Sequence, residues 1–121
     1  KNPNYSKYHK YFSPNDNSQV IGEATPIYMY WNKSIERIYV YNPQIKLIII
    51  LRNPIDRAFS HWNMERDKGR ESRTFLKAIL DEESKIKSPN YSQNKILSYL
   101  DRGYYSKQIK NIYNYFKKNL L

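Results

Sequence analysis

Hydrophobic positions along the chain change between a period of two residues and a helical period, which predicts alternating strands and helices. Residues 46–51 read KLIIIL, an apolar and β-branched run that is typical of a strand buried on both faces of a parallel sheet. Residues 19–23 form a shorter segment of the same kind. Between the two, residues 35–41 carry apolar side chains at helical spacing, after Ser34 as a candidate cap and before an Asn-Pro pair. This order of elements predicts a right-handed βαβ unit.

A second helix is predicted directly after residues 46–51. Asn53 is suited to cap a helix, and Pro54 is suited to its first position because a proline has no amide hydrogen to satisfy there. The apolar residues that follow recur every three or four positions, and they predict the face that packs on the core: Ile55, Ala58, Phe59 and Trp62.

The rest of the chain predicts further helices joined by polar loops. Two helices, at 74–87 and after Gly103, carry apolar stripes: Phe75, Leu76, Ile79, Leu80 and Ile86 on the first, and Tyr105, Ile109, Ile112, Tyr113 and Phe116 on the second. Smaller segments are a helical turn at 26–30, loops at 68–73 and 88–93, a short helix at 95–100 and the start of a strand at 120–121. We therefore predict one partial α/β domain over residues 1–121, with a parallel sheet flanked by helices.

Composition limits the chemistry of the protein. The 121 residues include 21 Lys and Arg against 11 Asp and Glu, a net charge of +10 that favours an anionic partner, unless it is only a solvated lysine-rich surface. No cysteine is present and the two histidines, His9 and His61, are far apart, so disulfides, thiol nucleophiles and histidine-rich metal sites are excluded. We expect no metal. The longest apolar run, 47–51, is far shorter than the roughly 20 residues of a membrane span.

The end of the predicted buried strand is the candidate site. Ligands of open α/β sheets bind at the carboxyl ends of the strands, and a helix that begins there offers free amides to an anion. Arg52 directly follows the strand, and its guanidinium can bind a phosphate through two hydrogen bonds. Ser60 lies about two helical turns further on, on the polar side of the helix, so both could contact one phosphate. The alternatives are a surface Arg52 paired with Asp56, and an ordinary helical serine.

Three segments, in order, resemble the sulfotransferases that use 3′-phosphoadenosine-5′-phosphosulfate, in particular the branch of the Golgi heparan sulfate sulfotransferases and their bacterial relatives. The segments are IGEATPIY at 21–28, LRNPIDRAFSH at 51–61 and RGYY at 102–105. The resemblance implies a P-loop-NTPase-like sulfotransferase fold. It also implies that Arg52 and Ser60 hold the 3′-phosphate of the donor, that Glu23 is the general base, and that Tyr105 lies near the nucleotide and the acceptor.

The reaction that this resemblance implies moves a sulfuryl group to an acceptor hydroxyl or amine, on a small molecule or a glycan, and releases adenosine 3′,5′-bisphosphate. No metal is required. Because the unperturbed pKa of a glutamate is about 4.3, burial would have to raise the pKa of Glu23 for efficient proton removal. Glu23 could instead form an ion pair with a lysine or arginine. The absence of cysteine favours a cytoplasmic bacterial protein over a Golgi lumenal one.

One part of the family pattern has no counterpart. The loop that holds the 5′-phosphosulfate is rich in glycine and carries a lysine, whereas this sequence has three glycines and no G-x-x-x-x-G-K pattern. We therefore expect an internal piece of a longer enzyme that is inactive by itself. Two alternatives stay open: a basic nucleic-acid-binding domain, disfavoured by the scattered basic residues, and a non-catalytic module on a sulfotransferase fold.

Overall fold

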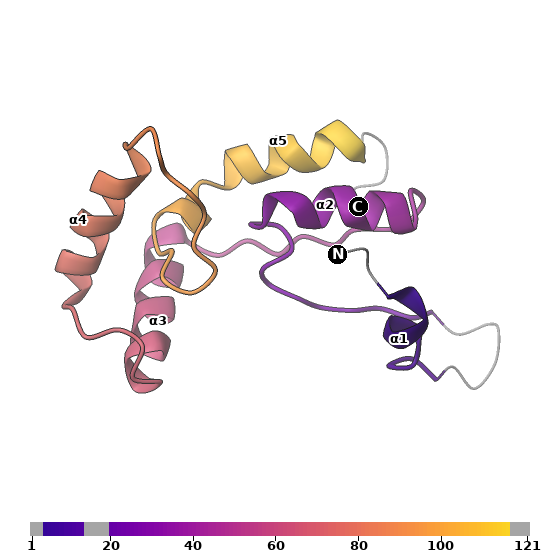
Figure 1. Ribbon diagram of the computed structural model, residues 1–121, viewed down its shortest axis with the longest axis horizontal. Coiled ribbons are helices and arrows are strands. Elements are labelled where there is room, and N and C mark those ends of the chain that lie inside the picture. Colours follow the sequence, from indigo (N-terminus) through magenta and orange to yellow (C-terminus); the bar gives the residue numbers. More distant parts are fainter. Residues whose placement is uncertain (1–3, 14–19, 117–121) are drawn as a thin grey trace.

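The computed structural model describes residues 4–13 and 20–116 of the chain. In these residues the elements are α1 (Tyr5–His9), α2 (Asn32–Tyr41), α3 (Pro54–Asp67), α4 (Phe75–Ile86), the 3₁₀ helix η1 (Asp101–Gly103) and α5 (Tyr105–Tyr115). Figure 1 shows α3 and α4 toward one end of the long axis, α2 and α5 side by side, and α1 toward the other end. The strand start predicted at 120–121, and Gln19 of the strand predicted at 19–23, lie outside the described residues.

Local capping explains where α3 and α4 begin. The Asn53 side chain accepts hydrogen bonds from the amides of Ile55 and Asp56, at 2.9 and 3.3 Å, and Pro54 is the first helical residue. The Thr74 side chain caps α4 in the same way. Both starts confirm the prediction from sequence. By contrast, α2 begins at Asn32 without a side-chain cap, so the prediction of Ser34 as its cap is wrong.

The buried residues form two separate clusters. The first joins α3, α4 and the segment before η1 through Ala58, Trp62, Ala78 and Tyr99. The second joins α2 and α5 through Ile35, Ile112 and Phe116, and on it rest partly buried side chains of the neighbouring segments, among them Met29, Ile45, Leu47 and Ile49. Burial of these apolar side chains, at about 25 cal/mol per Å², holds each helix pair together.

The predicted buried strand is only half buried here. Leu47 and Ile49 pack against the α2–α5 cluster, whereas Ile48 and Ile50, which point to the opposite side, are 79% and 91% exposed. This alternation is that of an extended segment with one covered face. Burial on both faces is therefore wrong for the residues that the structure describes, among which no strand is formed, and the parallel sheet stays a prediction. Val20 and Ile21 are exposed in the same way.

The predicted core stripes of α3 and α4 are correct only in part. Ala58 and Trp62 are buried as predicted, but Ile55 and Phe59 are 71% and 51% exposed. On α4, Phe75 and Ile79 pack on the first cluster, while Leu76 and Leu80 are exposed. The inner face of each helix also holds a buried acid, Glu65 on α3 and Glu82 on α4. A pattern of apolar residues does not include these acids, so it predicts the inner faces incorrectly.

The short helix predicted at 95–100 is not formed. The backbone amides of Tyr99, Leu100 and Asp101 instead donate to the Glu82 carboxylate, at 2.6, 2.9 and 3.1 Å. A carboxylate that binds three successive amides replaces the hydrogen bonds that a helix would supply, and it fixes the segment as the entry to η1.

Candidate functional site

Arg52 lies where the extended segment meets α3, directly before the Asn53 cap. Its side chain is exposed, and in the described part of the chain its guanidinium makes no hydrogen bond or ion pair, with Asp56 or any other acid. The Arg52 carbonyl accepts a hydrogen bond of 3.0 Å from the Tyr105 hydroxyl. The structure therefore brings Arg52 and Tyr105 together across 53 residues of sequence, and it leaves the guanidinium free to bind an anion.

Two features hold Tyr105 in this place. Gly103 packs against the first turn of α3 so closely that a Cβ added at Gly103 would lie 3.3 Å from the Cβ of Pro54. Arg57, half-buried on α3, donates to the carbonyl of Tyr99 and so joins α3 to the segment before η1. Arg57 thus points inward as a link between elements.

Ser60 is exposed on α3, seven residues after Asn53. Seven residues are close to two full turns, so Ser60 and Asn53 share one side of the helix. No hydrogen bond occupies the Ser60 hydroxyl in the residues that the structure describes. The helical register is thus consistent with a joint role of Ser60 and Arg52, which stays a prediction.

Glu23 lies in a cage of hydroxyl groups near α1. One carboxylate oxygen, Oε1, accepts from Thr25 at 2.9 Å and from Tyr28 at 2.6 Å, and Oε2 accepts from the Tyr8 hydroxyl. These hydrogen bonds, that of Tyr28 first, lower the pKa of Glu23, because they stabilise the charged form. The raised pKa that efficient proton removal would require is therefore not found in this arrangement, and in the described residues the carboxylate has no lysine or arginine partner.

Glu23 and Arg52 are not brought together. The hydrogen bond to Tyr8 fixes Glu23 beside α1, and Figure 1 shows α1 and α3 separated along the long axis of the molecule. Among the described residues, no hydrogen bond or ion pair joins Glu23 to Arg52, Ser60 or Tyr105. A donor that reached from Arg52 to the neighbourhood of Glu23 would have to be an extended molecule.

A basic group that the sequence did not single out lies between α3 and η1. The His61 side chain is 8% exposed, and its ring packs edge-on against Tyr99 at 5.1 Å. Burial, together with the positive charges of Arg102 and Arg57, lowers the pKa of His61 to about 4. Nδ1 of His61 and the Nε atoms of both arginines are buried without a hydrogen-bond partner in this structure. His61 is therefore a neutral, buried residue at neutral pH.

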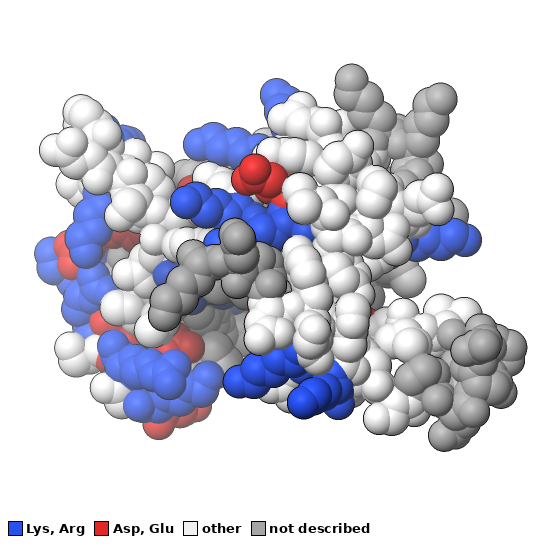
Figure 2. All heavy atoms as spheres, turned by 45° about the vertical axis from the view of Figure 1, so that its right-hand side comes forward, with Lys and Arg blue, Asp and Glu red and all other residues white. Residues whose placement is uncertain are grey.

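Three further findings concern surface charge, metal binding and membrane spanning. On the face seen in Figure 2, lysine and arginine side chains lie in several separate groups and not in one continuous stripe. Across residues 4–13 and 20–116, no three His, Cys, Asp or Glu residues come together as a set that could hold a metal ion. No helix in these ranges has the length and apolar character needed to cross a bilayer.

Comparison with known proteins finds similarity to sulfotransferases. No family model matches the chain. A segment of 59 residues, 49% of the chain, is 32% identical to the membrane-associated sulfotransferase kil1 of Dictyostelium discoideum and spans 12% of that protein. The structure is similar to the crystal structure of a sulfotransferase from Alicyclobacillus acidocaldarius, with a TM-score of 0.80 and 27% identity. That similarity covers 98% of this chain and 47% of the other.

In both sequence and fold, the chain is thus similar to sulfotransferases. It spans about half the length of the bacterial structure that it matches. The resemblance to sulfotransferases that rested on three short segments is confirmed by these similarities, which do not test the roles of single residues.

Proposed function

We propose that the whole protein is a sulfotransferase that uses 3′-phosphoadenosine-5′-phosphosulfate and releases adenosine 3′,5′-bisphosphate. The observation that carries the proposal is the similarity to a sulfotransferase structure over 98% of the chain. The unpaired guanidinium of Arg52 at the start of α3 supports it, because a positive charge beside a helix N-terminus suits a phosphate.

In this proposal Arg52 and Ser60 hold the 3′-phosphate of the donor. The Asn53 cap already binds two amides of the first turn, so the phosphate is held mainly by the guanidinium and the serine hydroxyl. Tyr105 donates a hydrogen bond to the Arg52 carbonyl, and in this proposal its ring borders the nucleotide that Arg52 binds. Because the chain has no G-x-x-x-x-G-K pattern, the 5′-phosphosulfate is held by other residues of the protein. A parallel sheet and a P-loop-like fold belong to the same proposal.

The chemical step is an in-line displacement at sulfur. The acceptor oxygen or nitrogen forms a bond to sulfur, and the bond between sulfur and the bridging phosphate oxygen breaks. That oxygen leaves on adenosine 3′,5′-bisphosphate, and the acceptor proton passes to the carboxylate of Glu23. Positioning and charge stabilisation supply most of the rate, as in phosphoryl transfer, and no metal is needed in this scheme. The acceptor is a small molecule or a glycan, and a cytoplasmic bacterial location is part of the proposal.

The donor site is tested by replacing Arg52 with alanine in the whole protein. We expect adenosine 3′,5′-bisphosphate to bind about 10- to 100-fold more weakly, since a charge-assisted hydrogen bond contributes about 1.5–3 kcal/mol. The matched control is Arg37→Ala on α2, because Arg37 is also exposed and unpaired among the described residues. Titration calorimetry with the nucleotide measures both. Equal affinities in the two variants would contradict the role of Arg52.

A nucleic-acid-binding function is supported only by the net charge of +10. The face seen in Figure 2 does not favour it, because a site for a nucleic-acid backbone needs basic side chains in a continuous patch, and on this face they lie in separate groups. Oligonucleotide binding that weakens with salt and that adenosine 3′,5′-bisphosphate does not displace would favour this alternative. A folded whole protein that binds the nucleotide but transfers no sulfate to any acceptor would favour a non-catalytic module.

A further inference from the structure

The Glu23 carboxylate has a position open for an acceptor proton on one of its two oxygens. In the residues that the structure describes, Oε1 accepts two hydrogen bonds, from Thr25 and Tyr28, whereas Oε2 accepts one, from Tyr8. A carboxylate oxygen accepts about two hydrogen bonds, so the open position is on Oε2. Glu23 is exposed, which lets an acceptor approach this oxygen. Tyr8 is therefore the residue that holds the oxygen to which the proton would pass.

Tyr8 differs from the other two donors in its place in the chain. Thr25 and Tyr28 lie two and five residues after Glu23, whereas Tyr8 lies 15 residues before it, on α1. The helix α1 has five residues, none of them buried. Because a helix this short is not stable by itself, contacts with the rest of the protein must hold α1, and with it the Tyr8 hydroxyl, against Glu23.

Tyr41 at the end of α2 supplies contacts of this kind. The centre of its ring lies 4.9 Å from that of Tyr5 and 5.9 Å from that of Tyr8, which it meets edge-on. Its hydroxyl is 2.8 Å from Nε2 of His9. Both ring separations are within the roughly 4.5–7 Å of favourable aromatic pairs. One α2 side chain thus contacts three residues of α1, which lies near this end of α2 in Figure 1.

We propose that Tyr8 and Tyr41 are positioning residues for sulfuryl transfer: Tyr8 orients Oε2 of Glu23, which takes the acceptor proton, and Tyr41 acts on this oxygen through Tyr8. The inference rests on the proposed function, because it takes Glu23 as the general base. In the step, the acceptor oxygen or nitrogen bonds to sulfur, the bond from sulfur to the bridging phosphate oxygen breaks, and the acceptor proton moves to Oε2. Tyr8 stays a donor, because its hydrogen bond to Glu23 raises the pKa of the Tyr8 hydroxyl.

The first test replaces Tyr8 by phenylalanine in the whole protein and titrates Glu23 directly by NMR. The side-chain carboxyl carbons of glutamate are labelled with carbon-13, and the Glu23 signal is the one that Glu23→Gln removes. The Tyr8 hydroxyl stabilises the charged carboxylate, so its loss should raise the pKa of Glu23. The other groups that face Glu23, Thr25 and Tyr28, stay in place, and no lysine, arginine or histidine among the described residues acts on this carboxyl.

The kinetics of Tyr8→Phe separate position from basicity. A higher pKa alone makes Glu23 a stronger base and would raise kcat. We expect kcat to fall about tenfold instead, because the carboxylate loses the hydrogen bond that orients Oε2 toward the acceptor. The affinity for adenosine 3′,5′-bisphosphate should stay unchanged.

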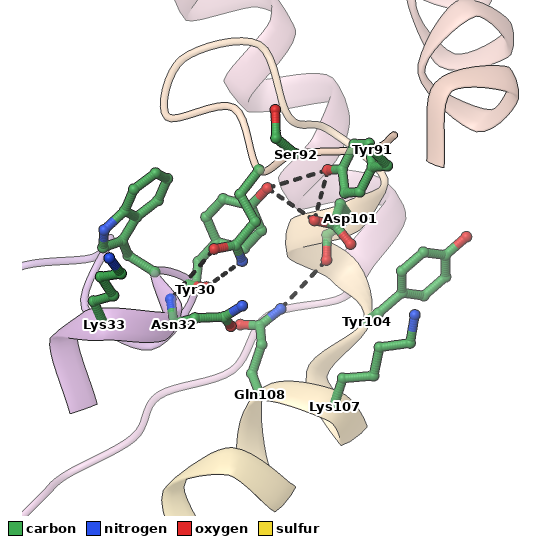
Figure 3. Close-up of a pocket in the computed structure, with 11 residues that line it drawn as sticks. Tyr30, Asn32, Lys33, Tyr91, Ser92, Asp101, Tyr104, Lys107 and Gln108 are labelled. Atoms are coloured by element: carbon green, nitrogen blue, oxygen red, sulfur yellow. Dashed lines mark hydrogen bonds between the residues drawn. The ribbon is translucent and has the colours of Figure 1, made fainter. Parts of the chain in front are cut away.

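Tyr91→Phe is the matched control, because it also removes a tyrosine hydroxyl from a carboxylate. Oδ2 of Asp101 accepts from the hydroxyls of Tyr30 and Tyr91, at 2.8 Å each. Figure 3 shows this group at a cavity of about 460 Å³ between the start of α2, the loop around residues 91–93, η1 and the start of α5. No interaction among the described residues joins it to Glu23, so Tyr91→Phe should leave the pKa of Glu23 unchanged.

Tyr41→Leu tests the longer path. We expect it to raise the pKa of Glu23 as Tyr8→Phe does, and to have no further effect on this pKa in the Tyr8→Phe background. Tyr41→Phe, which keeps the ring, should retain most of the original pKa. Tyr39→Leu is the control, because Tyr39 is 38% exposed against 39% for Tyr41, and its ring packs at the end of α5. Both leucine variants should lower the thermal midpoint alike, while only Tyr41→Leu shifts the pKa.

An unchanged Glu23 pKa in Tyr8→Phe would overturn the inference, and so would a kcat that does not fall. Equal pKa shifts in Tyr41→Leu and Tyr39→Leu would overturn the role of Tyr41. The titration needs neither donor nor acceptor. The expected shifts in a whole protein that transfers no sulfate would therefore contradict the proposed function and leave the coupling of Tyr41 to Glu23 intact. Sulfate transfer without those shifts would contradict only this inference.

Discussion

At the scale of single residues, the hydroxyl cage of Glu23 carries the clearest consequence for catalysis. Three hydroxyls donate to one carboxylate, and the pKa of that carboxyl is lowered as a result. A carboxylate with a lowered pKa stays ionised in mildly acidic solution, but it is a weaker base than one whose pKa lies near neutrality. The three hydroxyls therefore hold the Glu23 carboxylate in place and keep it charged, but they also make it a weaker base.

This balance predicts different effects for two substitutions in the whole protein. Glu23→Gln should lower turnover about 10²-fold or more, the usual effect of a lost general base, and leave nucleotide affinity unchanged. Tyr28→Phe removes the hydrogen bond that lowers the pKa most, so the acid limb of the profile of kcat/KM against pH should move to higher pH. Steady-state kinetics between pH 3 and pH 8 measure both. Near-normal turnover of Glu23→Gln would show that Glu23 is structural.

His61 gives a second prediction at this scale, on stability. Its pKa is about 4 in the folded state against 6.5 for the free side chain, so between these values the unfolded chain binds the proton and the folded chain does not. Stability is therefore full above pH 6.5 and falls as the pH decreases toward 4. The shift corresponds to a loss of about 3 kcal/mol, at 1.36 kcal/mol per pH unit.

His61→Gln should reduce this acid loss, since glutamine fills similar space without titrating. The measurement is the free energy of unfolding from urea titrations at pH 7 and pH 4. His9→Gln serves as the matched control, because His9 is exposed. If His61→Gln and the unmodified protein lost the same free energy between the two pH values, the buried neutral state of His61 would be refuted.

At the scale of elements, the starts of α3 and α4 were predictable, whereas their buried faces were predictable only in part. Asn53-Pro54 and Thr74 act through hydrogen bonds within three residues, so their sequence alone predicts the starts of α3 and α4. The buried face of a helix depends on what packs against it. Glu82 is buried because it binds the amides of a segment 17 to 19 residues away, which a pattern of apolar spacing cannot reveal.

The candidate site follows the same division between local and distant interactions. Arg52 and Ser60 were predicted from their place after a strand and on a helix, which are local features. The family resemblance implied only that Tyr105 lies near the nucleotide and the acceptor. Its contact with Arg52 was not predicted, and it goes with the close packing of Gly103 on the first turn of α3. The cavity between α2 and α5 had no signal in the sequence, because its walls come from four separate segments.

At the scale of the whole molecule, one side of the extended segment at residues 46–51 exposes large apolar side chains, and the predicted parallel sheet would explain why they are apolar. Ile48 and Ile50 are the type of residue that a protein buries, yet both are highly exposed in these 121 residues. The α3 residues Ile55 and Phe59 are exposed as well. The predicted parallel sheet would cover Ile48 and Ile50, since neighbouring strands and the helices on the second face would pack against them.

This explanation predicts unequal costs for two similar substitutions in the whole protein. Ile50→Thr should destabilise it by about 2 kcal/mol, because a hydroxyl would replace apolar atoms in a buried strand. Val40→Thr, a β-branched change at a site that is 72% exposed on α2, should have almost no effect. Chemical denaturation of both variants measures the difference. Both sites are exposed in the structure of this chain, so equal and small effects would mean that no sheet covers the segment, and a large effect confined to Ile50 would place it within one.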